Sequence, residues 1–570
     1  MLYKREWILA ATFLILASCL LFFPRLEGES KPDRAGLEDI RIVVQGKTEE
    51  NQIKLWKRED GVWFGFLPSG TQMDSVRLQA QDGLKVWVNG TSAEEGAGKI
   101  VPGEENRIEL RDQGGKVVEE GTVVFLASSQ LPSIHITTKS GSMEHIRSSQ
   151  ENEESGYLSI FSASGDTLYR GTADRIKGRG NTSWEAPKQS FSVKLDTGAS
   201  LLGMDSSRSW ILSANYYDGA YIRNRIGQEI GRKAGLSYSP EGVFADLYLN
   251  GEYWGIYELT EKIQMTEGFL FEIDYPERAA EEENVLFLRN DQPVVVHHPG
   301  TLTSDQQKAL QQWYQEMLAA LYAQDYINPQ TGKDIFEYLD LESFAARYLV
   351  EELFMDMDMG VTSHYMYMKE GTGILFQGPM WDLDNTLGRA QYDRNIFYAN
   401  QKDLGTNQMS RCYARLCGNA VFYQEVLEQW ERLKPFLVEL SEKGIDGTID
   451  PLYDSIEMDL VRWPGERSAY MSQLDMETNI RFLKQYLSDR TAFLDQAFVS
   501  QPEKTWELFG EQSVGLPQLE RIEAPEAEAT QQEEGAGWVA MHGEAFFGIL
   551  LFLLVCLVCM DRYRNRRGRA

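Results

Sequence analysis

Cysteine is scarce in this sequence, with five residues in a chain of 570. Three of the five, Cys19, Cys556 and Cys559, lie in apolar runs near the ends of the chain. Only Cys412 and Cys417 remain in the body of the protein, so a disulfide framework is excluded. These two could form one small-loop bridge in an oxidising compartment, but two buried thiols on a helix are the favoured interpretation.

Histidine and positive charge are also in short supply. The six histidines are scattered, and the adjacent pair His297 and His298 has no cysteine or carboxylate at a matching spacing, so a zinc site is not expected. Lysine and arginine number 56 against 86 aspartates and glutamates, which gives a formal net charge of −30. This charge argues against nucleic-acid binding as the main activity. The remaining composition, 42% hydrophobic and 11% aromatic, is typical of a globular protein.

Two long apolar runs lie near the ends of the chain. Residues 1–27 contain an uncharged run after a short basic start, and residues 545–560 form another, which is followed by five arginines within 561–570. By the positive-inside rule, the second run predicts a transmembrane helix with a cytoplasmic tail and an extracytoplasmic body. The first run fits an uncleaved transmembrane anchor and a cleaved signal peptide about equally well. The motif "LASC", which ends at Cys19, also resembles a lipoprotein box.

Between these runs the pattern of the chain changes twice. Residues 38–128 consist of short alternating segments with turns, which predict a small all-β domain that acts as a spacer, with ligand binding as the alternative. Residues 131–500 mix strands and helices, strands first, which predicts an α+β domain of two lobes. Apolar residues at three- and four-residue spacing predict helices over 304–324 and 340–354. Residues 511–540 are rich in glutamate and aperiodic, as expected of an acidic linker.

Two acidic clusters lie in the second half of the chain. The segment "FMDMDMG" at 354–360 carries Asp358, and "GPMWDLDNTLG" at 378–388 carries Asp382 and Asp384. A loop and a predicted hairpin separate the clusters, so we expect Asp358 and Asp382 to meet across a cleft. Two converging carboxylates suit a divalent metal ion, with one left to orient an attacking hydroxyl. An acidic surface turn is the alternative interpretation.

A basic segment that contains glycine lies further upstream. In "RIKGRGNTSW" at 175–184, a glycine turn with free backbone N–H groups could cradle phosphate, and a lysine that follows, Lys188 or Lys194, could neutralise it. An ordinary β-hairpin turn explains this segment equally well when it is taken alone. Only the acidic clusters that follow it favour a phosphate site.

Five segments occur in a fixed order along the chain: "KGRGNTSW…PKQSFSVKL", "WILSANYYDGAYIRNRIGQEIG", "LYLNGEYWGIYELTEKI", "DLESFAARYLVEELFMDMD" and "GPMWDLDNTLG". Together they resemble the spore coat CotH family of kinases over roughly residues 131–500. The resemblance implies an atypical, two-lobed protein-kinase-like fold that transfers phosphate from ATP to serine or threonine of a protein, with Mg²⁺ or Mn²⁺. The expected partners are therefore nucleotide, a Ser/Thr-rich surface or coat protein and, through the terminal runs, the membrane, but no nucleic acid.

The resemblance also implies a role for each acidic residue. Asp358 falls at the family's catalytic-loop aspartate and would orient the substrate hydroxyl, whereas Asp382 falls at its metal-binding aspartate. Asp384 would support Asp382 or hold a second metal ion. Ordinary protein kinases carry an asparagine metal ligand five residues after the catalytic aspartate, but this chain has Ser363 there, a weaker oxygen ligand. The neighbouring His364 is interpreted as a packed strand residue rather than a ligand.

On the nucleotide side, the resemblance implies that Lys194 pairs with phosphate, with Lys188 as the alternative. Glu229 would be the ion-pair partner of that lysine. Arg179 and Asn181 would line the nucleotide. The segment "YELTEKI" would form the nucleotide hinge, and it contains Glu258 and Glu261.

Three functions stay open at this point. The favoured one is a membrane-anchored, outward-facing kinase of Ser/Thr-containing proteins. Ser363 and the scarcity of ATP outside cells favour instead a catalytically silent kinase-like scaffold for envelope assembly or adhesion. A third candidate, a metal-dependent hydrolase that uses "WDLDN", lacks a histidine or a third carboxylate in register.

Overall fold

The computed structural model describes residues 35–44, 52–93, 100–288, 291–388, 393–404, 406–465 and 475–514. The chain divides into two compact units, Met1–Leu516 and Pro517–Ala570, and every described residue lies in the first. The predicted apolar runs within 1–27 and at 545–560, the basic tail and nearly all of the predicted acidic linker lie outside the described residues. Within those residues, no helix is both long enough and apolar enough to cross a bilayer.

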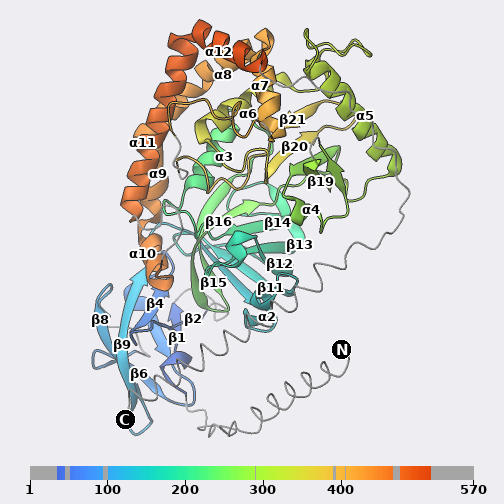
Figure 1. The fold of residues 1–570 in the computed structure, drawn as a ribbon. Coiled ribbons are helices and arrows are strands. Elements are labelled where there is room, and N and C mark those ends of the chain that lie inside the picture. Colours follow the sequence, from blue (N-terminus) through green and yellow to red (C-terminus); the bar gives the residue numbers. More distant parts are fainter. Residues whose placement is uncertain are drawn as a thin grey trace, which may run out of the picture. The chain divides into compact units, whose positions relative to one another are not determined.

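The first described strands form two small sheets (Figure 1). One has the order β2–β1–β5 and comprises Ile53–Lys54, Arg41–Val44 and Val76–Gln79. The other has the order β3–β4–β9–β8–β6–β7 and comprises Trp56–Lys57, Trp63–Leu67, Val117–Ala127, Glu105–Arg111, Lys85–Val88 and Thr91–Ser92. Residues alternate between buried and exposed along β5, as expected when one face of a sheet covers a core. The prediction of an all-β region ahead of the mixed region is confirmed.

A closed barrel follows, in the strand order β10–β11–β12–β13–β14–β16–β15. Its strands are Ser133–Thr138, Glu153–Phe161, Thr167–Arg179, Ser190–Ser200, Ser206–Ser213, Glu252–Glu261 and Gly242–Leu249. The parallel pair β10 and β15 closes the barrel, and the other neighbours are antiparallel. The aromatic-rich strand β16 is buried along almost its whole length, as expected of a strand covered on both faces. Two helices interrupt the barrel strands: α2, Glu144–Ser148, and α3, Arg223–Lys233.

A second, five-stranded sheet carries the order β18–β19–β17–β20–β21. Its strands are Val285–Phe287, Pro293–His298, Phe269–Ile273, His364–Met368 and Leu375–Gln377, and the short helix α4, Pro276–Ala279, lies beside β17 in the sequence. The α-helices that follow are α5, Ser304–Leu321; α6, Leu341–Phe354; α7, Gln408–Cys417; α8, Ala420–Glu439; α9, Ile445–Ile449; α10, Tyr453–Arg462; α11, Met476–Asp495; and α12, Pro502–Val514. The mixed α and β content, with strands before helices, agrees with the sequence prediction.

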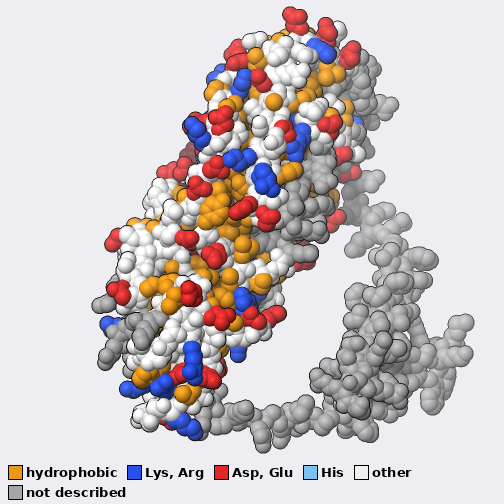
Figure 2. All heavy atoms as spheres, turned by 90° about the vertical axis from the view of Figure 1, so that its left-hand side faces the viewer, with side chains coloured by type: hydrophobic (Ala, Val, Ile, Leu, Met, Phe, Trp, Pro, Cys, Tyr) orange, Lys and Arg blue, Asp and Glu red, His pale blue; other side chains and the backbone are white. Residues whose placement is uncertain are grey.

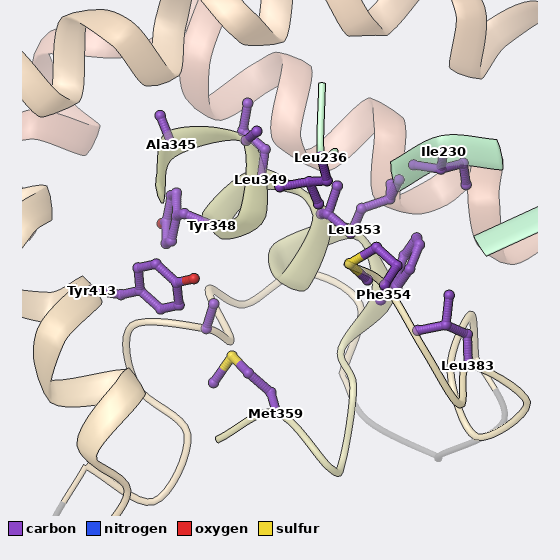
Figure 3. Close-up of a cluster of buried hydrophobic side chains, with 14 of the residues drawn as sticks. Ile230, Leu236, Ala345, Tyr348, Leu349, Leu353, Phe354, Met359, Leu383 and Tyr413 are labelled. Atoms are coloured by element: carbon purple, nitrogen blue, oxygen red, sulfur yellow. The ribbon is translucent and has the colours of Figure 1, made fainter. Parts of the chain in front are cut away.

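Helix α6 is the central helix of the largest core. Its first turn is capped by the Asp340 carboxylate, which accepts from the Ser343 N–H at 2.8 Å. Figure 3 shows Leu353 and Phe354 at its C-terminal end, on the side of Leu383. Tyr348 instead faces Tyr413 of α7, with the two ring centres 5.6 Å apart. Contacts on several sides fix the end of α6, and with it the start of the loop that follows Phe354.

The two cysteines of the described chain lie on α7. Cys412 and Cys417 are both buried and free. The favoured interpretation of two buried thiols on a helix is therefore confirmed, and a small-loop bridge is not formed. Burial raises the pKa of the Cys412 thiol to about 12, so it stays protonated and unreactive at neutral pH.

The core of the N-terminal sheets also contains residues from later in the chain. Tyr248 and Tyr253 of the barrel and Met458 of α10 belong to the same buried cluster as the strand residues. The Tyr248 hydroxyl donates to the Phe66 carbonyl at 3.3 Å. Figure 1 shows α10 beside the N-terminal strands, although hundreds of residues separate them in sequence. Two tyrosines of the barrel and helix α10 therefore complete the core of the N-terminal strands, while the interior of the barrel forms a separate buried cluster.

Charge is mixed on the surface drawn in Figure 2. Acidic and basic side chains are intermingled there over the described residues, with hydrophobic side chains between them. The large negative charge of the sequence is therefore not gathered into one patch on this face.

Candidate active site

The loop that carries Asp358 is fixed by several side chains. Met355 ends α6 in the left-handed conformation, with φ of 50°. The Asp358 N–H donates to Asp356 Oδ1 at 2.9 Å. The Lys402 ammonium donates to the carbonyls of Met357 and, at 3.1 Å, Met359, the residues on either side of Asp358. These contacts hold the backbone of Asp358 in one conformation and leave its half-buried side chain for other partners.

Asp382 lies across from this loop, just after β21. Ser363 Oγ donates to Asp382 Oδ2 at 3.4 Å, which joins the two predicted oxygen ligands. Burial and then the negative charge of Asp382 raise the pKa of Asp358, whereas Lys402 and a hydrogen bond from Asn385 lower it. The structure therefore brings Asp358, Ser363 and Asp382 together, with Asp382 exposed to solvent. Asp384 follows in the same turn and is half-buried.

These residues fit a magnesium or manganese ion that is shared with phosphate. Among the described residues, no group of three or more His, Cys, Asp or Glu side chains could enclose a metal ion. Mg²⁺ in nucleotide-dependent enzymes is often held by one or two carboxylates and completed by substrate phosphates and water. The Asp382 carboxylate and the Ser363 hydroxyl supply hard oxygen donors of that kind, in an open position.

A group of cations lies on the side of the basic glycine segment. Arg179, at the end of β12, has its guanidinium carbon 5.4 Å from the centre of the Trp381 ring. Burial lowers the pKa of Arg179, and the charge of Asp382 opposes this effect. Lys262 lies close enough that Arg179 and Arg175 add to the effect of burial in lowering its pKa. Arg179 therefore lies near the Asp382 carboxylate, and Lys262 lies near both Arg179 and Arg175.

Arg278 connects the basic segment to the acidic loop. With its amide oriented to satisfy both groups, Asn181 accepts from the Arg278 guanidinium, with the oxygen 3.0 Å from Nη1. Arg278 Nη1 also donates to Thr362 Oγ1 at 2.9 Å and to Asp274 Oδ1 at 3.2 Å. Arg278 and Lys262 were both missed by sequence reasoning. No motif marks Arg278, whereas Lys262 belongs to the "YELTEKI" segment, whose glutamates were the predicted residues.

The two candidate lysines have different surroundings. Lys188 is fully buried, with its Nζ 2.7 Å from Asp459 Oδ1 of α10. Its ammonium also donates to the carbonyls of Ile256 at 2.6 Å and Ala214 at 3.0 Å. Lys194 is half-buried on β13, and its ammonium has no hydrogen bond or ion pair with another described residue.

The structure does not bring Glu229 to either lysine. Glu229 lies on α3, and its carboxylate is 4.0 Å from Arg225 on the same helix. The carboxylate that pairs with Lys188 is Asp459, which sequence reasoning missed because it lies far along the chain. No local pattern could have identified that pair.

His364 is a buried residue of β20. Its Nε2 lies 3.0 Å from Gln377 Oε1, and its Nδ1 lies 3.2 Å from Arg347 Nη2. Burial, followed by the charge of Arg347, lowers the pKa of His364 well below its usual value. The neutral ring therefore donates from Nε2 and accepts at Nδ1, and neither nitrogen is available to a metal ion.

Glu258 of the predicted hinge segment is buried inside the fold. Burial raises its pKa to about 7, while a hydrogen bond from Asn215 and the charges of Arg225 and Arg232 lower it, and Asp218 raises it slightly. Burial also raises the pKa of Glu261, which lies at the end of β16 and is half-buried. Neither glutamate has a contact with Asp358 or Asp382 among the described residues.

The buried Glu258 predicts a loss of stability as the pH rises. Its folded pKa of about 7 lies above the ordinary value of 4.5, so the folded state binds the extra proton between these values. Stability from this group is complete below about pH 4.5 and falls as the pH rises through 7, by roughly 3 kcal/mol. The measurement is urea unfolding of the wild-type chain and Glu258→Gln at pH 5 and pH 8. We expect the free energy of unfolding of Glu258→Gln, relative to that of the wild type, to be higher at pH 8 than at pH 5. The same difference between the two proteins at both pH values would contradict this prediction.

Comparison with known proteins identifies one family. A family profile described as CotH kinase protein matches residues 176–494, which include the barrel from β12 onwards, the second sheet and the helices up to α11. The matched range contains both aspartate clusters and covers more than half of the chain. No curated protein matches the chain.

Proposed function

The chain belongs to the CotH kinase family, and on this basis we propose that it transfers phosphate from ATP to serine or threonine of a protein. The observation that supports the proposal is the meeting of Asp358, Ser363 and Asp382 at one open position, beside the cations of the basic segment. Phosphoryl transfer depends mainly on positioning and on charge stabilisation, and these are what such a set of residues can provide.

Asp358 is the proposed group that receives the acceptor hydroxyl. Burial and the charge of Asp382 raise the pKa of Asp358, which makes its carboxylate a better proton acceptor. Asp382 and Ser363 would hold Mg²⁺ or Mn²⁺, with Asp384 available for a second ion or for support. The metal ion would neutralise charge on the phosphates when it is bound.

The nucleotide phosphates would lie against Arg179, Asn181 and a lysine. Because the Lys188 ammonium is fully buried and already paired with Asp459, we assign it a structural role and favour Lys194 for contact with the ligand. Lys262 is a further candidate, because burial and the neighbouring charges of Arg179 and Arg175 disfavour its ammonium form, which a bound phosphate would stabilise. Glu229 would act only indirectly, through α3.

We propose further that the terminal apolar runs anchor the chain in a membrane, with the kinase facing outward and the arginine-rich tail in the cytoplasm. The acceptor would then be a Ser/Thr-rich surface or coat protein. The competing proposal is a catalytically silent scaffold for envelope assembly or adhesion, and the substitution at Ser363 is the feature that favours it.

Phosphate transfer from radiolabelled ATP by the full-length chain, with Mg²⁺ or Mn²⁺ and a Ser-rich acceptor, tests the proposal. Asp358→Asn and Asp382→Asn should each lower the rate at least 10²-fold, an order-of-magnitude figure for removal of one acid–base or electrostatic group. Asp305→Asn is the matched control, because Asp305 is exposed in the first turn of α5. It should retain wild-type activity.

Two outcomes would count against parts of the proposal. Nucleotide binding without transfer, with either metal ion, would support the silent scaffold. Transfer that survives in Asp358→Asn at the wild-type rate would remove Asp358 from its proposed role.

A further inference from the structure

The backbone at Asp382 is held in an uncommon conformation. Its φ is 57°, in the left-handed region that residues other than glycine rarely occupy unless surrounding contacts hold them there. The next peptide N–H, that of Leu383, donates to Asn224 Oδ1 at 2.7 Å. Asn224 lies in the first turn of α3, far from Asp382 in sequence. A side chain from α3 therefore holds the peptide next to the proposed metal-binding aspartate.

Asn224 is itself held by a chain of partly buried hydrogen bonds. Its Nδ2 donates to Asn215 Oδ1 at 3.2 Å, and Asn215 Nδ2 donates to Glu258 Oε2 at 3.2 Å and to the Tyr221 carbonyl at 3.1 Å. Because the Leu383 N–H can only donate, Asn224 must present its oxygen to it. That choice fixes the amide orientation of Asn224, then that of Asn215, and requires an acceptor at the end of the chain. The Glu258 carboxylate and the Tyr221 carbonyl are the acceptors there.

The side chain of Leu383 is fixed by the same helix. Leu383 is fully buried, and a Cβ placed on Gly227 would lie 2.6 Å from its Cδ1. Asn224 and Gly227 are three residues apart on α3 and therefore share one face. The glycine permits close approach of the loop, and the asparagine fixes its backbone.

We propose that Asn224 is a positioning residue for Asp382, and that Asn215 and Glu258 hold Asn224 in the orientation that this requires. The inference rests on the proposed function, in which Asp382 holds the metal ion. By this proposal Asn224 of α3, Glu258 of β16 and Asn215 of the loop after β14 position Asp382 without binding the metal ion or the phosphates themselves.

The test is Mn²⁺ binding to the full-length chain in the presence of a fixed excess of a non-transferable ATP analogue. Electron paramagnetic resonance measures the bound Mn²⁺. Asp382→Asn lacks the proposed metal-binding carboxylate, so it gives the background level of Mn²⁺ binding. Asn224→Ala should raise the Mn²⁺ dissociation constant roughly tenfold, the effect of losing one hydrogen bond. Asn224→Asp keeps an oxygen for the Leu383 N–H but loses the donor to Asn215, so its effect should be smaller than that of Asn224→Ala. Lys233→Ala, an exposed change on the same helix, should have no effect.

Hydrogen exchange of the Leu383 amide supplies a second readout that does not depend on the metal. Exchange should be faster in Asn224→Ala and, more weakly, in Asn215→Ala, with the melting temperature within a few degrees of the wild type. Wild-type Mn²⁺ affinity in both alanine variants would overturn the proposal, and so would a wild-type chain that binds no Mn²⁺. A chain that binds Mn²⁺ without transferring phosphate would refute only the kinase activity, and the affinities of the variants would still decide the role of Asn224.

Discussion

Replacement of Lys188 by methionine is expected to destabilise the protein by about 3–5 kcal/mol, the usual effect of removing one partner of a buried ion pair. Methionine fills the same space but leaves the Asp459 carboxylate, which is fully buried, without its cation. The carbonyls of Ala214 and Ile256 lose a charged donor as well. The measurement is the free energy of urea unfolding of the full-length chain, with tryptophan fluorescence as the probe of unfolding.

Lys194→Met is the matched control, because the same substitution is made six positions along the chain. Lys194 is half-buried, and its ammonium has no hydrogen bond or ion pair with another described residue, so a loss below about 1 kcal/mol is expected. A double variant, Lys188→Met with Asp459→Leu, should recover part of the loss because no charge is left unpaired. If Lys194→Met proved the more destabilising single change, the structural role assigned to Lys188 would be wrong.

Arg490→Met should destabilise the protein by a similar amount, about 3–5 kcal/mol. Arg490 of α11 is fully buried and forms an ion pair with Glu352 of α6, at 3.4 Å. Its guanidinium also donates to the backbone carbonyls of Glu352, of Arg394 at 2.6 Å and of Ile396 at 2.8 Å. The substitution therefore leaves a buried carboxylate without its cation, and three carbonyls lose the donor that Arg490 supplies.

This variant should also loosen the segment that braces Asp358. The Glu352 carboxylate accepts from the backbone N–H groups of Tyr398 and Ala399, at 2.7 and 2.9 Å, a few residues before Lys402. Limited proteolysis should therefore cut within 393–404 faster in Arg490→Met. Arg432→Met, which removes the largely exposed partner of Glu425, is the control and should change stability by less than about 1 kcal/mol. Equal stability of the two variants would contradict the argument.

Local patterns predicted much of the architecture. The three- and four-residue spacing of apolar residues located α5 and α6, and Asp340 marked the start of α6, because helix periodicity and capping depend on neighbouring residues. Asp358 and Asp382 could be paired from the sequence, since only a loop and a short hairpin separate them. Their meeting depends on few long-range contacts.

The rest of the site depends on contacts that the sequence does not mark. Asp459 approaches Lys188 from α10, and Arg278 joins Asn181 to Thr362 from a four-residue helix. The expected pairing of Glu229 with a lysine assumed the geometry of ordinary protein kinases. In this chain Arg225 lies one helical turn away from Glu229, and α10 supplies the carboxylate instead.

The core shared by the N-terminal strands and α10 has a consequence for the order of folding. Ser128 and Ser455 lie with their hydroxyl oxygens 2.9 Å apart, and Met458 completes the cluster around Phe66. Chains are made from the N-terminus, and domains usually fold in that order during synthesis. Here the strands between residues 41 and 127 must wait for α10, more than 300 residues later. Contacts of such high sequence separation slow folding, so we expect the nascent N-terminal strands to need protection from aggregation until residue 462 has been added.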